Sequence, residues 1–171
     1  GDFSLLAQRL VGDGGLVIAV EPEPENCHWI EKSIAANGYH GIRLVEAALS
    51  DGEGEATLYL GEKSGWHTLA PGQEGSCGEV RVRTTTLDWL CTDLPRVDVV
   101  KIDVQGAESR VLAGASTTLS RYRPVVLLDV AAIGRSFDAL NYDAFPMTNL
   151  ACRLDALPEG PAEVCLKPRP T

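Results

Sequence analysis

Three acidic residues, Glu21, Asp103 and Asp129, each stand at the end of an apolar stretch that is typical of a buried strand. Carboxylates in such positions can bind the hydroxyl or amino groups of a ligand, or act as a general base. In open α/β sheets the ligand crevice lies beyond the carboxyl ends of the strands. We therefore expect Glu21 and Asp103 to open into a single cleft.

Glu21 has the position of a nucleoside-binding carboxylate. An acidic residue at the end of a second strand can accept hydrogen bonds from both ribose hydroxyls, about 20 residues after a glycine of the first turn. Gly1 and Glu21 have this separation, and Pro22 and Pro24 fix the turn that follows. In the alternative interpretation, Glu21 only caps the next helix. Asn26 is expected to be the N-cap of that helix, or else to orient the Glu21 loop.

The segment 99–108 delivers Asp103 to a strand end and then turns at a glycine into a helix. Asp103 is our first candidate near a reacting centre, where it would bind a ligand, hold an acceptor or serve as a base. The alternative is an ion pair with Lys101, which points to the same strand face and is expected to be a structural partner. Glu108 lies in the first turn of the following helix. Its position there is explained either by the helix dipole alone or by a catalytic role.

The glycine-rich loop 61–78 carries two further candidates, Trp66 and His67. If the flanking strands form a flap, this loop overhangs the crevice. His67 would then accept a proton near neutral pH, or it is incidental to the site. Trp66 is expected to anchor the loop on the sheet, with contact to an acceptor substrate as the alternative.

Length, charge and cysteine content limit the class of protein. The chain has 171 residues, of which 44% are hydrophobic, which suffices for one domain, 1–171. Its net charge of -9 argues against a nucleic-acid partner or an anionic membrane surface. Five scattered cysteines without a C-x-x-C spacing favour neither a disulfide framework nor a metal site and indicate a reducing, cytoplasmic location. No apolar run approaches the roughly 20 residues that span a bilayer.

The order of elements predicts an α/β fold with a mostly parallel, doubly wound sheet. The expected helices cover residues 3–11, 26–37, 87–91 and 107–119. The expected strands cover residues 16–20, 42–47, 55–60, 80–85, 97–103 and 125–130, with 55–60 and 80–85 antiparallel. The weakly patterned residues 131–156 are interpreted as a dimer surface or as the closing antiparallel hairpin, ahead of a proline-rich tail.

Four segments, in this order, resemble successive motifs of the FkbM-type methyltransferases: residues 1–6, 20–24, 86–88 and 101–108. Residues 111–115 continue the match, which covers about residues 1 to 130. The resemblance implies a Rossmann-like class I methyltransferase fold, S-adenosylmethionine as methyl donor, and usually an oxygen atom as acceptor. The acceptor would be the hydroxyl of a small molecule, glycan or lipid. The oligomeric state stays open.

The resemblance also implies roles for individual residues. Contacts to the cofactor are expected from Gly1, Phe3, Glu21, Pro22, Ala48, Leu49 and Asp103. The residues that follow strand 42–47 would flank the adenine, although buried packing explains Ala48 and Leu49 equally well. Asp103, Glu108 and His67 are the catalytic candidates, and no metal is expected.

The chain departs from the family pattern in two places. Gln105 stands where the family usually has glutamate, and no strand with an Asp-x-Gly-Ala-Asn-type loop precedes Gly1. In the class I topology that strand lies between those ending at Glu21 and Asp103, so we expect these two not to pair directly. Unpaired buried backbone groups cost about 1 to 3 kcal/mol each. We therefore expect the chain to be the downstream part of a longer product, or another segment to supply the strand.

Two other classes of protein remain as alternatives. A dinucleotide-dependent oxidoreductase would share the acidic strand tip, but it has no counterpart to the motif at 101–108. A catalytically inactive remnant or binding protein would follow from the missing cofactor loop. Calorimetry with S-adenosylhomocysteine on this chain and on a version extended upstream distinguishes truncation from loss of function.

Overall fold

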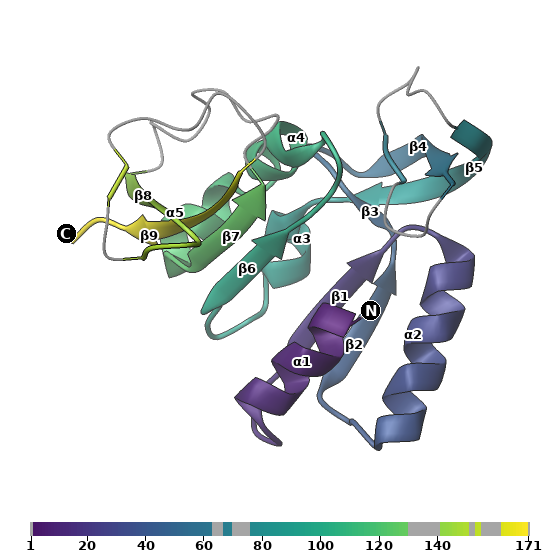
Figure 1. Cartoon of the computed structure of the whole chain (residues 1–171), viewed down its shortest axis with the longest axis horizontal. Coiled ribbons are helices and arrows are strands. Elements are labelled where there is room, and N and C mark those ends of the chain that lie inside the picture. The colour runs from purple at the N-terminus through teal and green to yellow at the C-terminus, as the bar shows by residue number, and fades with distance from the viewer. Residues whose placement is uncertain are drawn as a thin grey trace.

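Two parallel strands, β1 (Val17–Glu21) and β2 (Ile42–Glu46), pair in register from Val17 and Ile42 to Glu21 and Glu46. The computed structural model describes residues 2–62, 67–69, 76–129, 141–150, 153–154 and 162–170 of the chain. Helix α1 (Asp2–Val11) contacts β1, and helix α2 (Pro24–Asn37) contacts both strands (Figure 1). The expected helices and strands are present here, with boundaries that differ by one or two residues.

A second sheet holds β3 (Ala48–Leu49), β5 (Ser76–Thr85) and β4 (Gly54–Gly61) in that order. Strands β4 and β5 are antiparallel, as predicted, and β3 runs parallel to β5. Residues 67–69 return to β4, where Tyr59 and Thr68 exchange two backbone hydrogen bonds of 2.9 and 3.0 Å. Part of the loop that connects β4 and β5 therefore pairs with β4.

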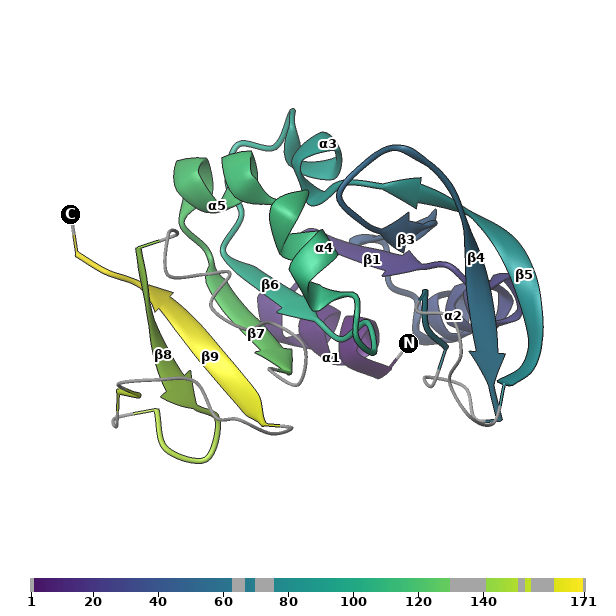
Figure 2. The ribbon, with the colours of Figure 1, turned by 90° about the horizontal axis from the view of Figure 1, so that it is seen from above.

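The third sheet has the order β6-β7-β9-β8, formed by β6 (Val99–Ile102), β7 (Val125–Asp129), β9 (Glu163–Pro168) and β8 (Tyr142–Pro146). Strands β6 and β7 are parallel, and β9 is antiparallel to both of its neighbours. Helices α3 (Leu87–Cys91), α4 (Glu108–Ala113) and α5 (Ser116–Tyr122) lie on one side of β6 and β7 (Figure 2).

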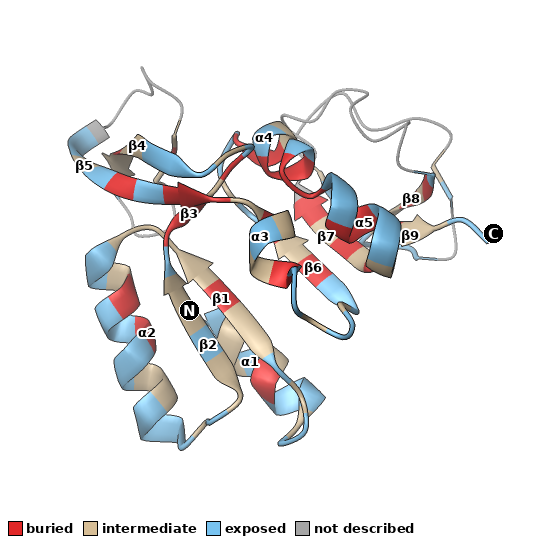
Figure 3. Ribbon diagram, turned by 180° about the vertical axis from the view of Figure 1, so that it is seen from behind, coloured by how far each residue is buried: buried red, intermediate tan, exposed pale blue. Residues whose placement is uncertain are grey.

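The main core lies between these three helices and the third sheet. Buried residues of α4 and α5 pack against those of β6 and β7, and Figure 3 shows where the buried residues lie along these elements. The strands contribute Val100, Ile102, Val126 and Leu128, and the helices contribute Leu87, Cys91, Val111, Leu112 and Leu119. This burial holds β6 firmly, and Asp103 directly follows that strand.

The single helix predicted for residues 107–119 is wrong, because two shorter helices, α4 and α5, occupy this segment. The break falls at Gly114, whose carbonyl accepts a hydrogen bond from the Asp88 backbone at 3.0 Å. A Cβ atom at Gly114 would lie only 2.1 Å from the carbonyl oxygen of Ser50. Tertiary contact with a distant loop therefore interrupts the helical pattern.

The C-terminal part closes the third sheet with antiparallel strands, which is one of the two interpretations given for residues 131–156. Strand β9, however, lies in the proline-rich tail, where no strand was predicted. Its centre is the short apolar run Val164, Cys165 and Leu166, all of them buried. A continuous apolar run is typical of a strand that is covered on both faces.

Strands β1 and β6 belong to different sheets, and they do not pair with each other. The expectation that these two strands are not direct neighbours is thus confirmed. The α/β class is confirmed, whereas one mostly parallel, doubly wound sheet is not, because the described strands form three sheets of mixed direction. None of the described helices has the length and apolar character needed to span a bilayer.

Candidate functional site

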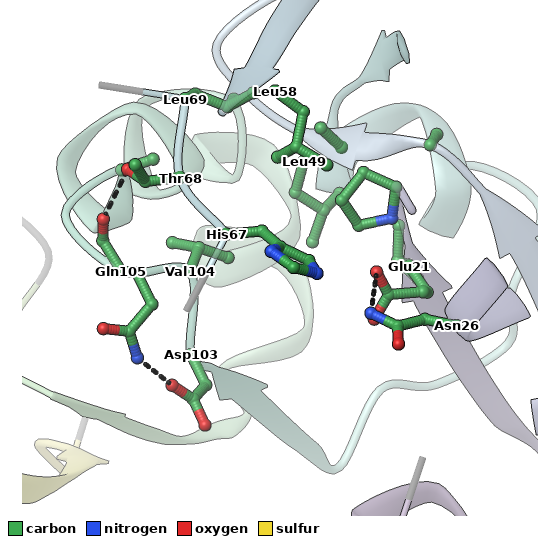
Figure 4. Close-up of a pocket in the computed structure, with 15 residues that line it drawn as sticks. Glu21, Asn26, Leu49, Leu58, His67, Thr68, Leu69, Asp103, Val104 and Gln105 are labelled. Carbon is green, nitrogen blue, oxygen red and sulfur yellow. Dashed lines mark hydrogen bonds between the residues drawn. The ribbon is translucent and has the colours of Figure 1, made fainter. Parts of the chain in front are cut away.

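A pocket opens where β1, β2 and β6 end, beneath the hairpin of β4 and β5 (Figure 4). The space within it, with the open solvent at its mouth included, amounts to about 640 Å³. Both acidic strand tips, Glu21 and Asp103, line it, as expected for the crevice of an α/β protein. The other lining residues are Val20, Pro22, Asn26, Ala47, Ala48, Leu49, Leu58, His67, Thr68, Leu69, Val104, Gln105 and Ala107.

Glu21 is the last residue of β1, and its carboxylate is oriented by the turn that follows. Its Oε1 atom accepts hydrogen bonds from the backbone N–H of Glu23 at 3.0 Å and from Asn26 Nδ2 at 3.4 Å. The N-cap of α2 is Glu23, which accepts from the backbone of Glu25 and Asn26. Both cap interpretations, Glu21 and Asn26, are therefore wrong: Pro24 already begins the helix, and Asn26 orients Glu21 instead.

Cys27 forms a hydrogen bond with the same turn. Its thiol donates a hydrogen bond to the backbone carbonyl of Glu21 at 3.2 Å. Burial, followed by the negative charge of Glu21, raises the pKa of the Cys27 thiol to about 12. The thiol therefore stays protonated and remains a donor. This contact was not predicted, and the short separation of Cys27 from Glu21 in the sequence was its only local signal.

Asp103 faces the pocket while it is held by its neighbours. Lys101 Nζ lies 2.7 Å from Oδ2, and Gln105 Nε2 lies 3.3 Å from Oδ1. The predicted pairing with Lys101 is confirmed, yet half of the Asp103 side chain, 50%, is exposed. Asp103 can therefore belong to an ion pair and meet a ligand at once.

Phe3 and Glu108 do not line the pocket. The ring of Phe3 instead lies against the Lys101 ammonium group, 4.1 Å from ring centroid to Nζ, because α1 places it beside β6. Glu108 is only 3% exposed, and its Oε1 accepts the backbone N–H of Gly106 at 3.1 Å. Among the described residues, its other oxygen has no partner. The side chain of Glu108 thus turns inward, although the preceding Ala107 reaches the pocket.

Three further candidates lie outside what the structure describes. These are Gly1, predicted to contact the cofactor, Trp66 in the loop, and the side chain of Asp129.

The apolar part of the pocket includes the residues that come after β2 in the sequence. Ala48 and Leu49, the predicted adenine neighbours, line it together with Leu58 and Leu69. Ala48 is also buried at 4% exposure, so it takes part in packing as well as in the lining. Small and branched apolar side chains at this place form a surface on which a flat base can lie.

The segment 67–69 connects the hairpin to the Asp103 turn. The Thr68 hydroxyl donates to the backbone carbonyl of Gln105 at 2.8 Å, and His67 Nδ1 accepts the backbone N–H of Gly61 at 3.1 Å. Gln105 and Gly106 have positive φ angles of 48° and 96°, so the turn is sharp, and only Gly106 adopts this region without strain. Thr68 was not singled out in the sequence, because only the tertiary fold brings it to Gln105.

The arrangement combines two carboxylates, an apolar surface and an imidazole in one pocket. These groups suit a nucleoside that also carries a cationic or amino group. Within the described ranges, no group of three or more His, Cys, Asp or Glu side chains could hold a metal ion.

Comparison with known proteins points to one family. The model of the Methyltransferase FkbM domain matches residues 1–148. Among solved structures, the methyltransferase FkbM from Methylobacillus flagellatus KT is similar with a TM-score of 0.60 at 15% identity. The alignment covers 96% of this chain and 40% of that one, so the chain spans about two fifths of the solved protein. No curated protein matches the chain significantly.

Proposed function

Because the chain belongs to the FkbM methyltransferase family, we propose that its pocket binds S-adenosylmethionine and serves methyl transfer to an oxygen atom. The observation that carries this proposal is the meeting of Glu21 and Asp103 in one pocket. For the domain as a whole we infer a Rossmann-like class I arrangement over residues 1–171, which the likeness to the solved methyltransferase supports.

The residues of the pocket fit the chemistry of this cofactor. Glu21, oriented through its Oε1, would accept hydrogen bonds from the ribose hydroxyls. Ala48 and Leu49 would flank the adenine, next to the rigid turn that begins at Pro22. Asp103 would attract the amino group and the positive charge of the sulfonium.

S-adenosylmethionine, when bound, supplies an electrophilic methyl group on a sulfonium sulfur. The contribution of the chain is alignment, because fixed geometry replaces the entropy cost of bringing two reactants together. Glu21 and Asp103 extend from different sheets and would hold the ribose and the methionine part of the donor. Asp103 also has the accessible carboxylate that can take up a proton from a hydroxyl acceptor.

We propose a small molecule, glycan or lipid hydroxyl as acceptor. The overall charge of -9 favours an uncharged or cationic acceptor over a nucleic acid.

Calorimetry with S-adenosylhomocysteine tests the proposal on the 171-residue chain. We expect the chain to bind and Glu21→Gln to bind about 10 to 100 times more weakly, as for loss of a charged hydrogen bond. Glu55→Gln is the matched control, because Glu55 pairs with Arg81 on the surface and does not line the pocket. Absence of binding by the unmodified chain, or equal losses in both variants, would contradict the proposal.

A further inference from the structure

One nitrogen of the His67 ring forms a hydrogen bond with the backbone of its own hairpin. Its Nδ1 atom accepts the N–H of Gly61 at 3.1 Å. A neutral imidazole carries a single N–H, and a nitrogen that accepts a hydrogen bond does not carry the proton. The neutral ring in this structure therefore carries its hydrogen on Nε2.

The backbone of the segment that carries His67 is fixed by the neighbouring Thr68. Thr68 is 2% exposed and exchanges two backbone hydrogen bonds with Tyr59. The Thr68 hydroxyl also donates to the carbonyl of Gln105 at 2.8 Å. The segment is thus tied both to β4 and to the Asp103 turn, which holds the backbone of His67 beside the pocket, and the Gly61 contact orients the ring.

The ring faces the pocket between Val104 and Glu21 (Figure 4). The two charged groups of the lining, Glu21 and Asp103, are both hydrogen-bond acceptors. Among the described residues, none forms a hydrogen bond with Nε2 of His67. A ligand there meets two accepting carboxylates and one donating imidazole.

We propose that His67 is a binding residue that donates its Nε2–H to a lone pair of the nucleoside, a ring nitrogen or a ribose oxygen, and does not serve as a proton acceptor. The identity of the ligand rests on the proposed function, whereas the protonation of the ring rests on the Gly61 contact alone. The pocket then selects a nucleoside with an acceptor atom facing the hairpin. The proton of a hydroxyl acceptor goes to Asp103, not to the imidazole.

A long-range ¹H–¹⁵N spectrum of the histidine-labelled chain at neutral pH tests the protonation without any ligand. The chain has three histidines, and the exposed His28 and His40 serve as internal references. We expect His67 in the Nε2–H form, assigned by its absence in His67→Gln. A predominant Nδ1–H form, or an averaged mixture like that of His28 and His40, would overturn the inference.

Calorimetry with S-adenosylhomocysteine tests the role of the donor. Glutamine places an amide N–H near the former Nε2–H, whereas leucine offers none. We expect His67→Leu to bind about 10 times more weakly, His67→Gln to stay within about 3-fold, and the surface control His40→Leu to be unchanged. Equal affinities for His67→Leu and His67→Gln would overturn the role of the donor. If the unmodified chain fails to bind, both the proposed function and this ligand contact fall, while the spectrum still decides the form of the ring.

Discussion

The carboxylate of Asp88 closes the N-terminus of α5, with Oδ1 2.6 Å from the backbone nitrogen of Thr118. Its Oδ2 accepts the backbone N–H of Thr117 at 3.0 Å. Asp88 belongs to one of the segments that resemble the family motifs, and the structure gives it this structural role. Burial would raise the pKa of Asp88, but the hydrogen bonds from Thr118 and Thr117 outweigh it and lower the pKa.

Asp88→Ala should destabilise the fold by about 1 to 2 kcal/mol at neutral pH, as for the loss of a helix cap. Because the pKa is lowered in the folded state, this stabilisation is present above the unfolded value and is lost as the pH falls through the folded pKa. The difference from wild type should begin to shrink below about pH 4. Urea unfolding at several pH values measures it, with the exposed Asp13→Ala as control. A pH-independent difference would contradict this account.

Gly114→Ala should destabilise the chain strongly. Its Cβ would meet the backbone oxygen of Ser50 at 2.1 Å, and a backbone atom cannot move aside as a flexible side chain can. Overpacking of this kind costs about 1 to 3 kcal/mol. Gly52→Ala is the matched control, because no atom lies within 4 Å of the added Cβ. Equal urea midpoints for the two variants would show that α4 and Ser50 do not pack as described.

Asp103→Asn should weaken the binding of S-adenosylhomocysteine about 10-fold or more, because a charge-assisted contact is lost. Its ion pair with Lys101 is half exposed, so stability should change by less than about 1 kcal/mol. Asp98→Asn is the control, since Asp98 pairs with Arg96 ahead of β6 and does not line the pocket. Calorimetry and thermal unfolding on the same samples separate the two effects, and a large stability loss with unchanged affinity would refute the assignment.

Cys27 should resist alkylation while the chain is folded. With a pKa raised to about 12, almost no thiolate is present at about pH 8.5, and the side chain is buried as well. The exposed Cys77 should react first and serves as the control in the same molecule. Iodoacetamide labelling followed by peptide mass spectrometry measures the two rates. Labelling of Cys27 as fast as Cys77 in the native chain would contradict the buried position beneath Glu21.

Local signals in the sequence were sufficient for many element boundaries. Gly38 ends α2 in a left-handed conformation with φ of 65°, and Thr86 caps α3 through the backbone N–H of Trp89, both as their residue types indicate. The break at Gly114 could not be predicted, because the helical pattern continues across it. Its cause is a contact with Ser50, which only the tertiary structure supplies.

In the site, too, residues with a local sequence signal could be predicted, and residues placed by tertiary contacts could not. Glu21 and Asp103 were recognisable because each is an acidic residue at a strand end, where an α/β fold gathers its ligand contacts. Asn26 was misread as a cap, because Glu23 takes that role ahead of Pro24. The contacts of Cys27 and Thr68 join positions that are not related by a strand or helix repeat, so no periodicity could reveal them.

The separation of β1 from β6 has a mechanical consequence. No hydrogen-bonded ladder between described strands joins the sheet of Glu21 to that of Asp103, so backbone pairing does not set the gap between these two carboxylates. A ligand that contacts both carboxylates would bridge the two sheets. Its affinity would then depend on the distance between them, and its binding would stiffen the whole domain.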